Sequence, residues 1–269
     1  MSKKRVLFVS QEIMPYLPET QMSRIGRFLP QKIQERGKEI RTFMPRYGLV
    51  NERRNQLHEV IRLSGMNIIV DEIDYPLIIK VASIQQARMQ VYFIDNEDYF
   101  KRKFLFRDKD EKFFEDNDER IGFFARGVLE TVKKLGWGPD LIHLHGWFTA
   151  LVPFYVKTLY KDNPLFIDSK IIISLYNDAF EEKFGKKFGK KIFVKGMDKS
   201  LTEKYNNTDY ISLMKSAIDN ADAVIAGDQE VNPELMEYAK SNGKYFLDYQ
   251  GDEDYYEKYN EFYDKIIEE

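Results

Sequence analysis

Short runs of consecutive hydrophobic residues alternate along this chain with longer segments that are hydrophobic at every third or fourth position. The short runs predict strands buried on both faces, and the longer segments predict helices that pack one face against a sheet. The first such unit is a strand over Arg5–Ser10, a helix over 22–36 closed by Gly37, and a strand over 39–44. Repetition of this unit predicts an α/β fold with a doubly wound, Rossmann-like parallel sheet.

The same alternation continues to the end of the chain. Further strands are predicted over 68–70, 77–82, 89–94, 141–145, 170–175 and 223–227, and further helices over 121–135, 149–160, 213–221, from 233 onward and in the tail. Residues 96–117 are predicted to form a charged loop with at most a short helix. No stretch has the composition of a linker, so we predict a single domain over 1–269 with a helical tail at about 248–269.

The stretch 138–153 is the most informative part of the chain. It opens with a Gly-Pro turn, continues as a hydrophobic run that contains His143 and His145, and breaks at Gly146 into an amphipathic segment. Two residues apart on a strand, the histidines point the same way. Ligands of open α/β sheets bind at the carboxyl ends of the strands, so both histidines are candidate functional residues. The alternative is a pair of buried histidines with satisfied hydrogen bonds.

Composition narrows the class of protein. The chain has 269 residues, is 43% hydrophobic, contains no cysteine and carries a net charge of −3. It has no run of about 20 hydrophobic residues and no signal peptide, so we predict a cytoplasmic protein that does not bind a membrane. The charge gives no drive toward nucleic acid. Glycine-rich phosphate loops and metal-binding motifs are absent from the sequence, which predicts no cofactor and no metal.

A near-repeat is the one motif outside this pattern. Residues 183–186 and 187–190 both read Lys-Phe-Gly-Lys. Such a basic, glycine-containing segment is suited to a phosphate group or a partner, but the simpler interpretation is a solvated loop.

Several motifs, in register from about residue 4 to residue 236, resemble the N-terminal half of bacterial glycogen synthases and plant starch synthases. Residues 44–48 resemble that family's "LPRYG" and residues 91–100 its "VYFLD…DYF". Residues 116–126 resemble "DNAERFAFFSR", and residues 135–153 resemble "LGWKPDIIHCHDWHTALVP". Each motif alone is weakly diagnostic, but together they are specific.

The resemblance implies a fold and a reaction. Members of the family have the GT-B architecture, in which two Rossmann-like domains flank a cleft, and they transfer glucose from ADP-glucose or UDP-glucose to an α-1,4-glucan. This chain resembles the first, starch synthase catalytic domain, which mainly contacts the acceptor, and the second, nucleotide-sugar domain is predicted to be absent. The resemblance therefore implies substrate contacts from Glu12, Tyr16 and Trp147.

The sequence departs from the family at the loop that approaches the donor. The family's "KTGGL" falls on residues 18–22, where Pro18 replaces the lysine and Thr20 and Gln21 replace two glycines. A cation for the donor's phosphates is therefore missing, and the backbone cannot approach a ligand as closely. Arg24 stands where the family has an aspartate.

Polar residues of the cleft are substituted as well. Gly146 replaces the aspartate of "HDWHT", Phe148 replaces its second histidine, and Tyr176 replaces the histidine of "IHN", of which only Asn177 remains. Framework residues persist while cleft residues change, which favours a retained fold with lost donor chemistry.

Three functions remain open on the sequence. The first is a domain that is non-catalytic alone, a pseudoenzyme, which binds an α-glucan such as glycogen or a maltooligosaccharide or pairs with a separate chain, and for which a nucleotide sugar is a disfavoured ligand. The second is an active glycosyltransferase completed by a second-domain partner chain or a homo-oligomer, with His143, His145 and Asn177 as candidate catalytic residues. The third is a scaffold with a vestigial cleft, whose acidic, tyrosine-rich tail docks in the cleft or on a partner.

Overall fold

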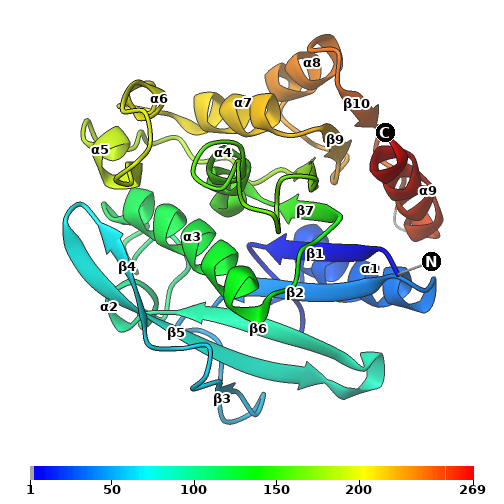
Figure 1. The fold of residues 1–269 in the computed structure, drawn as a ribbon, viewed down its shortest axis with the longest axis horizontal. Coiled ribbons are helices and arrows are strands. Elements are labelled where there is room, and N and C mark those ends of the chain that lie inside the picture. The colour runs from blue at the N-terminus through cyan, green and yellow to red at the C-terminus, as the bar shows by residue number, and fades with distance from the viewer. Residues whose placement is uncertain (1–2, 252) are drawn as a thin grey trace.

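The computed structural model describes residues 3–251 and 253–269, which form one sheet with helices on both faces (Figure 1). The strands are β1 (Arg5–Ser10), β2 (Glu39–Pro45), β3 (His58–Glu59), β4 (Met66–Val70), β5 (Ile73–Ile84), β6 (Met89–Asp95), β7 (Leu141–His145), β8 (Lys170–Leu175), β9 (Ala223–Ala226) and β10 (Tyr245–Leu247). The helices are α1 (Gln21–Glu35), α2 (Glu97–Phe100), α3 (Asn117–Leu135), α4 (Leu151–Lys157), α5 (Phe188–Ile192), α6 (Ser200–Glu203), α7 (Tyr210–Asn220), α8 (Pro233–Ser241) and α9 (Tyr255–Glu268), with 3₁₀ turns η1 (Gln85–Ala87) and η2 (Trp147–Thr149).

The order of the strands places a crevice beside β1. The sheet runs β10-β9-β8-β7-β1-β2-β6-β5-β3, with β4 paired to β5. The strands from β10 to β6 pair in parallel, and β5, β3 and β4 form an antiparallel margin. After β1 the chain first adds strands on one side, β2 and then β6. It later returns to the other side of β1 and adds strands from β7 to β10. This reversal between β1 and β7 is the topological switch point at which open α/β sheets bind ligands.

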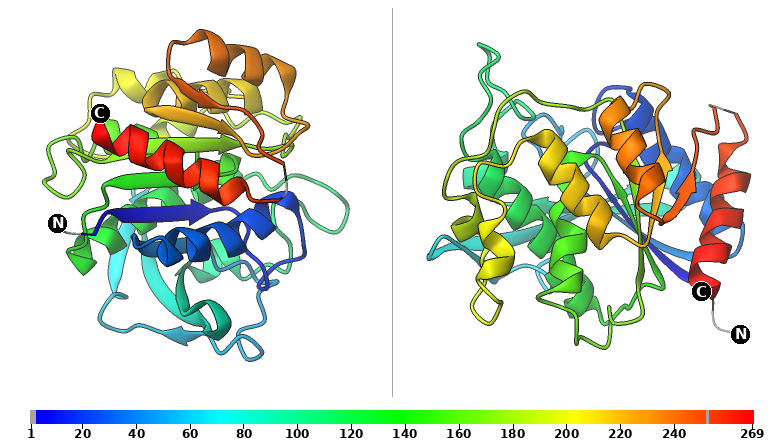
Figure 2. Two further views of the ribbon diagram at one scale, coloured as in Figure 1. Left: turned by 90° about the vertical axis from the view of Figure 1, so that its right-hand side faces the viewer. Right: turned by 90° about the horizontal axis from the view of Figure 1, so that it is seen from above.

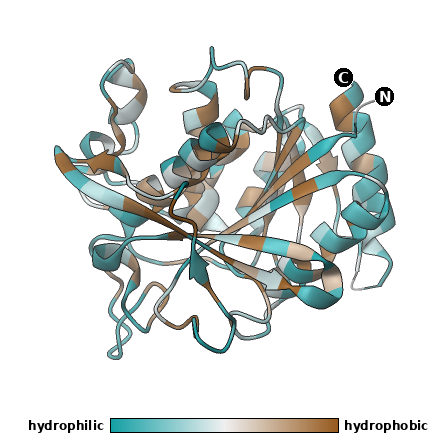
Figure 3. Cartoon of the chain, turned by 60° about the horizontal axis from the view of Figure 1, so that its bottom comes forward, coloured by the Kyte–Doolittle hydropathy of each residue, from teal (hydrophilic) through white to brown (hydrophobic). Residues whose placement is uncertain are grey.

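The helices form two layers over the sheet. Helices α1 and α9 lie side by side on one face, whereas α3, α4 and α7 pack in sequence on the other (Figure 2). Right-handed crossovers require this division, because the β1–α1–β2 connection runs opposite to those that follow β6. Hydrophobic residues concentrate along the central strands, and the outer surfaces of the helices are largely hydrophilic (Figure 3).

Local capping explains where α1 begins and where α3 ends. The Thr20 hydroxyl accepts the Ser23 N–H at 3.0 Å while the Ser23 hydroxyl accepts the Thr20 N–H at 2.8 Å, a capping box that starts α1. Helix α3 ends where Gly136 adopts a left-handed conformation with φ of 61°.

The predicted fold class is confirmed, and β1 and β8 have the predicted bounds. The prediction of a loop with at most a short helix over 96–117 is confirmed: Asn96 caps the short helix α2 by accepting the N–H groups of Asp98 and Tyr99. The interpretation of 183–190 as a solvated loop was wrong in part, since this segment contains the start of α5 and buries both of its phenylalanines. Strands β3 and β10 and helix α6 are too short to give a hydrophobic pattern.

Helix α9 confirms the predicted helical tail and shows how it docks. Tyr259, Phe262, Tyr263 and Ile266 are buried, and they face the sheet next to α1. At one end of the helix, Arg36 of the α1 C-cap forms an ion pair with Glu257. None of the helices in residues 3–251 and 253–269 is long and apolar enough to cross a membrane.

Candidate functional site

A cleft of about 300 Å³ opens at the switch point between β1 and β7. The segments that follow the carboxyl ends of β1, β7, β8 and β9 all contribute to it, as do the N-terminus of α1 and the loop after α2. Its lining comprises Gln11, Glu12, Thr20, Gln21, Met22, Leu105, Phe106, Arg107, Phe113, Trp147, Tyr176, Asn177, Asp178, Ala179, Phe180 and Asp228. An aromatic wall facing a polar rim is typical of a small-molecule site.

Gln11 ties the two strands together at the base of the cleft. Its N–H donates to the His145 carbonyl at 3.0 Å, and its side-chain oxygen accepts the Phe148 N–H at 3.0 Å. Between these two bonds, Gly146 has φ of 85°, and a Cβ there would lie 2.8 Å from both Gln11 Oε1 and Met22 Cε. Only glycine fits this conformation without strain, so the turn after β7 has no side chain at this position.

Trp147 and Asp178 form the centre of the wall between β7 and β8. The Trp147 N–H donates to Asp178 Oδ2 at 3.0 Å, and the Tyr210 hydroxyl donates to Asp178 Oδ1 at 2.7 Å. The Trp147 ring packs on Phe106 and Phe180 with centroid distances of 4.7 and 4.9 Å. Trp147 therefore offers only part of its ring to the cleft, and Asp178 holds the tryptophan turn in place.

We expect Asp178→Asn to change how stability depends on pH. Burial raises the pKa of Asp178 to about 6, although hydrogen bonds from Tyr210 and Trp147 oppose the shift. The folded chain thus holds this proton more tightly than the unfolded chain, so the contribution of Asp178 to stability is full below about pH 4 and is lost as the pH rises to about 6. The unfolding free energy of the wild type minus that of the variant should fall across this range in urea titrations. A difference that does not vary with pH would contradict the shifted pKa.

The predicted residues Glu12 and Asn177 both line the cleft. Glu12 Oε2 accepts a hydrogen bond from the Thr20 hydroxyl at 2.8 Å, which links the first loop to the start of α1. Asn177 is exposed, and its amide donates to Glu230 at 3.4 Å. Of the three residues that replace the family's donor loop, Thr20 and Gln21 line the cleft and Pro18 does not.

His143 and His145 lie below the cleft and do not line it. Their ring centroids lie 3.9 Å apart with the planes tilted, which confirms that they share one face of β7. His143 contacts the Tyr263 hydroxyl and lies 2.7 Å from the Ser174 hydroxyl, whereas His145 Nδ1 lies 2.7 Å from the Tyr176 hydroxyl. Burial lowers the pKa of His143 well below its ordinary value, with a contribution from His145, and lowers the pKa of His145 to about 3.

These two histidines are consequently neutral at physiological pH and screened from a ligand by Tyr176 and α9. Tyr176 itself is buried, and its ring leaves no room for a Cβ on Gly227, whose ideal position is 2.6 Å from the ring. Tyr16 also lies away from the cleft, in a separate hollow with Arg54 and Gln85, and its ring packs edge-on against Phe93 at 4.9 Å. Of the predicted substrate-contacting residues, only Glu12 and Trp147 face the cleft.

The charges around the cleft are predominantly negative. Glu12, Asp178 and Asp228 line it, and the only cation that does so in the described part of the chain is Arg107. The two terminal guanidinium nitrogens of Arg107 donate to the two carboxylate oxygens of Glu182, at 2.6 and 2.8 Å. The positive charge of Arg107 is thus already neutralised, and an anionic ligand would meet three carboxylates.

Two contributors to the cleft are not apparent from sequence reasoning alone. Asp178 directly follows Asn177 at the end of a predicted strand, and that position was its only signal. Arg120 carries no local signal for its role: it is buried in α3, donates to the Leu105 carbonyl at 2.7 Å and to Asn117 Oδ1 at 2.6 Å, and so anchors the loop that forms the aromatic wall. Within the described residues no group of three or more histidines and carboxylates is placed to hold a metal ion.

Residues 5–248 match the family described as starch synthase catalytic domain. Among curated proteins, a glycogen synthase of Chlorobium luteolum is 34% identical over 223 residues, which is 81% of this chain and 44% of that protein. A glycogen synthase of Chlorobium phaeobacteroides is 40% identical over 177 residues, 64% of this chain and 36% of that protein. The chain thus spans less than half the length of these relatives.

A solved structure shows the same fold. The catalytic domain of Starch Synthase IV from Arabidopsis thaliana, bound to ADP and acarbose, aligns with a TM-score of 0.69 at 17% identity. The alignment covers 93% of this chain and 52% of that one.

Proposed function

This chain belongs to the starch synthase catalytic domain family, and on that premise we propose that its cleft binds an α-glucan without transferring glucose by itself. The charge of the cleft carries the proposal. Three carboxylates line it, and its cation Arg107 is held by Glu182. A nucleotide sugar brings a diphosphate, which such a surface repels, whereas a neutral glucan has no charge to be repelled.

The side chains at the substituted positions support the same conclusion. Phe148 is buried among Tyr47, Phe106 and Arg120, and Tyr176 closes over His145. Neither can donate a hydrogen bond to a leaving nucleotide in the cleft, and Gly146 has no side chain to contribute. Because glycosyl transfer depends on electrostatic stabilisation of the leaving group, loss of these donors removes much of the catalytic power.

The remaining lining is suited to sugar rings. Phe106 and Phe113 are partly exposed and provide aromatic surface next to the nearly buried rings of Trp147 and Phe180, while Glu12 and Asn177 provide hydrogen-bonding groups. Aromatic faces and convergent polar groups are the usual recognition elements of a neutral, hydroxyl-rich ligand.

Calorimetric titration with a maltooligosaccharide, and in parallel with ADP-glucose, tests this proposal directly. We expect heat from the glucan and none from ADP-glucose. Binding of ADP-glucose would overturn the charge argument and favour an active transferase completed by a partner chain or by a second copy. Failure of both ligands to bind would favour a scaffold whose cleft is vestigial.

The variant Asn177→Ala should weaken glucan binding by about two- to tenfold, because it removes one exposed hydrogen-bonding group from the rim. Asn67→Ala is a matched control, since Asn67 is also exposed but lies on β4 away from the cleft. The same titration, run on both variants, measures the effect. Equal affinities for the two variants would remove Asn177 from the glucan site.

A further inference from the structure

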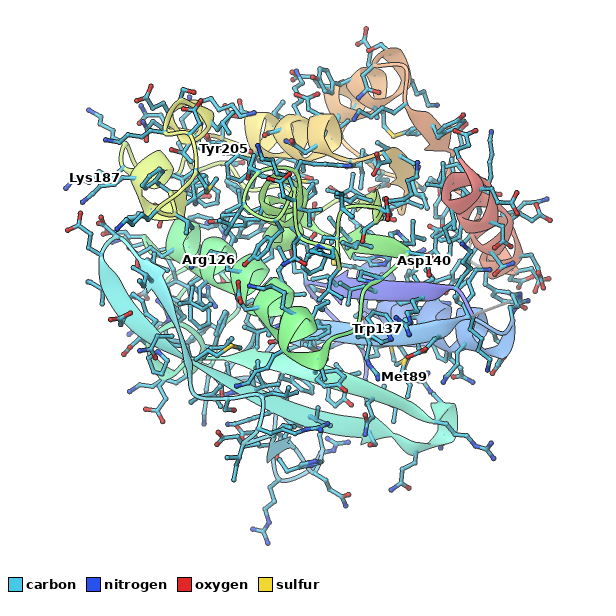
Figure 4. All side chains as sticks on the ribbon, in the orientation of Figure 1. Met89, Arg126, Trp137, Asp140, Lys187 and Tyr205 are labelled. Carbon is cyan, nitrogen blue, oxygen red and sulfur yellow. The ribbon has the colours of Figure 1, made fainter. Side chains whose placement is uncertain are left out.

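The Lys-Phe-Gly-Lys near-repeat is anchored to the body of the protein by its phenylalanines. Phe184 and Phe188 are buried and their rings are 4.8 Å apart, whereas Lys186, Lys187 and Lys190 are exposed. Phe188 begins α5 and Phe184 lies in the segment before it, and their ring contact places both phenylalanines inside the protein. Lys187 lies at the outer edge of the molecule, on the α5 side (Figure 4). The segment is therefore a fixed surface that presents lysines.

These lysines surround a hollow of about 390 Å³ between α5 and α6. It is lined by Glu72, Lys186, Lys187, Gly189, Lys190, Phe193, Lys199, Thr202, Glu203 and Asn206. Gly189 holds the two helices together: its N–H donates to Asn206 Oδ1 at 3.0 Å, and a Cβ on it would lie 2.3 Å from the Thr202 carbonyl oxygen. We call this feature the lysine hollow. It shares no lining residue with the cleft.

The lysine hollow is a strongly positive region of a chain whose net charge is −3. Residues 183–204 contain eight lysines and only two acidic residues, Asp198 and Glu203. Lys190 pairs with Asp71 at 2.7 Å and with Glu72 at 3.4 Å, at the tip of the β4–β5 hairpin. Lys186, Lys187 and Lys199 have no carboxylate within 4.0 Å in the described part of the chain, and the four lysines of the lining outnumber its two carboxylates, Glu72 and Glu203.

We propose that the lysine hollow binds a small anion that carries two or more phosphate groups, either as a free oligophosphate or on a sugar. Several lysines held around one concavity repel one another, and a multiply charged anion relieves that repulsion. Lysines bind phosphates as point charges, and the volume falls in the range of small-ligand sites. The proposal is independent of glucan binding in the cleft.

The test is calorimetric titration with tripolyphosphate and, separately, glucose 1,6-bisphosphate. The variant K186Q/K187Q/K199Q should lose about tenfold or more in affinity for whichever of them binds, because three charge contacts are removed. K186R/K187R/K199R should retain binding, since it keeps the charges. The control K103Q/K109Q/K161Q makes the same change in net charge at exposed lysines outside the hollow, and it should bind within about twofold of the wild type.

The relative affinity for the two ligands distinguishes a free oligophosphate from a phosphorylated sugar, and either result supports the site. The proposal is overturned if the wild type binds neither ligand at about 10 mM, the weak end of specific affinity. It is also overturned if the hollow and control variants lose affinity equally, because attraction would then reflect net charge alone.

Discussion

Deletion of residues 255–269, which contain α9 and the final residue, is expected to leave a chain that no longer folds cooperatively. The helix buries Tyr259, Phe262, Tyr263 and Ile266 against the sheet. Burial of each such side chain stabilises the folded state by about 1.5–3 kcal/mol, so the four together contribute about 6–12 kcal/mol. Since a domain of this kind is stable by only about 5–15 kcal/mol, the loss is comparable to the whole free energy of unfolding.

Deletion also removes a hydrogen-bond partner from the core. His143 contacts the Tyr263 hydroxyl through Nδ1, and without α9 this buried nitrogen faces solvent or an empty hydrophobic surface. Urea unfolding followed by near-ultraviolet circular dichroism measures the result. The variant Tyr263→Phe separates the two effects: it keeps the ring and should cost only about 1–3 kcal/mol. A deletion variant with the unfolding midpoint of the full chain would show that α9 is dispensable.

The sequence pattern predicts that α9 is a helix but not what it covers. The spacing of Tyr256, Tyr259 and Tyr263 gives the helix, since residues three and four apart share one face. The partner of that face, His143, is 120 positions away along the chain. A contact between residues so far apart in the sequence leaves no local pattern, so the docking of the tail onto β7 can be recognised only in the folded structure.

The two histidines illustrate the same limit. A spacing of two on a strand predicts that they point the same way, and the close contact of their rings confirms it. Which face they occupy depends on the layer that packs there. In this fold α9 covers that face, so His143 and His145 belong to the core and not to the cleft. A strand buried on both faces gives no signal in sequence that distinguishes these two outcomes.

The residues at the rim were more predictable because the family resemblance named them and because they lie just beyond the ends of strands. Glu12, Trp147 and Asn177 directly follow strands β1, β7 and β8, and all three line the cleft. Their roles in binding stay predictions. The carboxyl end of a parallel strand is where a side chain leaves the sheet, so such residues converge whatever their identity.

The substituted positions at the switch point are adapted to one another. Gly146 leaves room for Gln11 and Met22, and Gln11 in turn accepts the Phe148 N–H. On the next strand, Tyr176 bonds to His145 and packs on Gly227. Restoring one family residue therefore disturbs several neighbours, so a single substitution changes more than the side chain that it introduces.

Gly146→Asp, which reinstates the residue of the family motif, is accordingly expected to destabilise the protein by about 2–6 kcal/mol and not to restore ADP-glucose binding. With φ of 85° and ψ of 161°, Gly146 occupies a region that is essentially restricted to glycine. A Cβ would lie 2.8 Å from Gln11 Oε1 and from Met22 Cε. Both are ends of flexible side chains and can move, but Gln11 would then abandon the buried Phe148 N–H.

Two further variants separate the causes of the loss in unfolding free energy, which is measured by urea unfolding. Gly146→Ala carries the same backbone strain and contact without the charge, so it should show most of the destabilisation. Gly37→Asp places the same side chain at a positive φ of 92° where nothing lies within 4 Å, and it should cost only about 1–2 kcal/mol. If Gly146→Asp destabilised the protein no more than Gly37→Asp does, the turn after β7 would be able to accommodate a side chain. The present glycine would then be no barrier to regaining a carboxylate in the cleft, and the case for a non-catalytic site would rest on its charge alone.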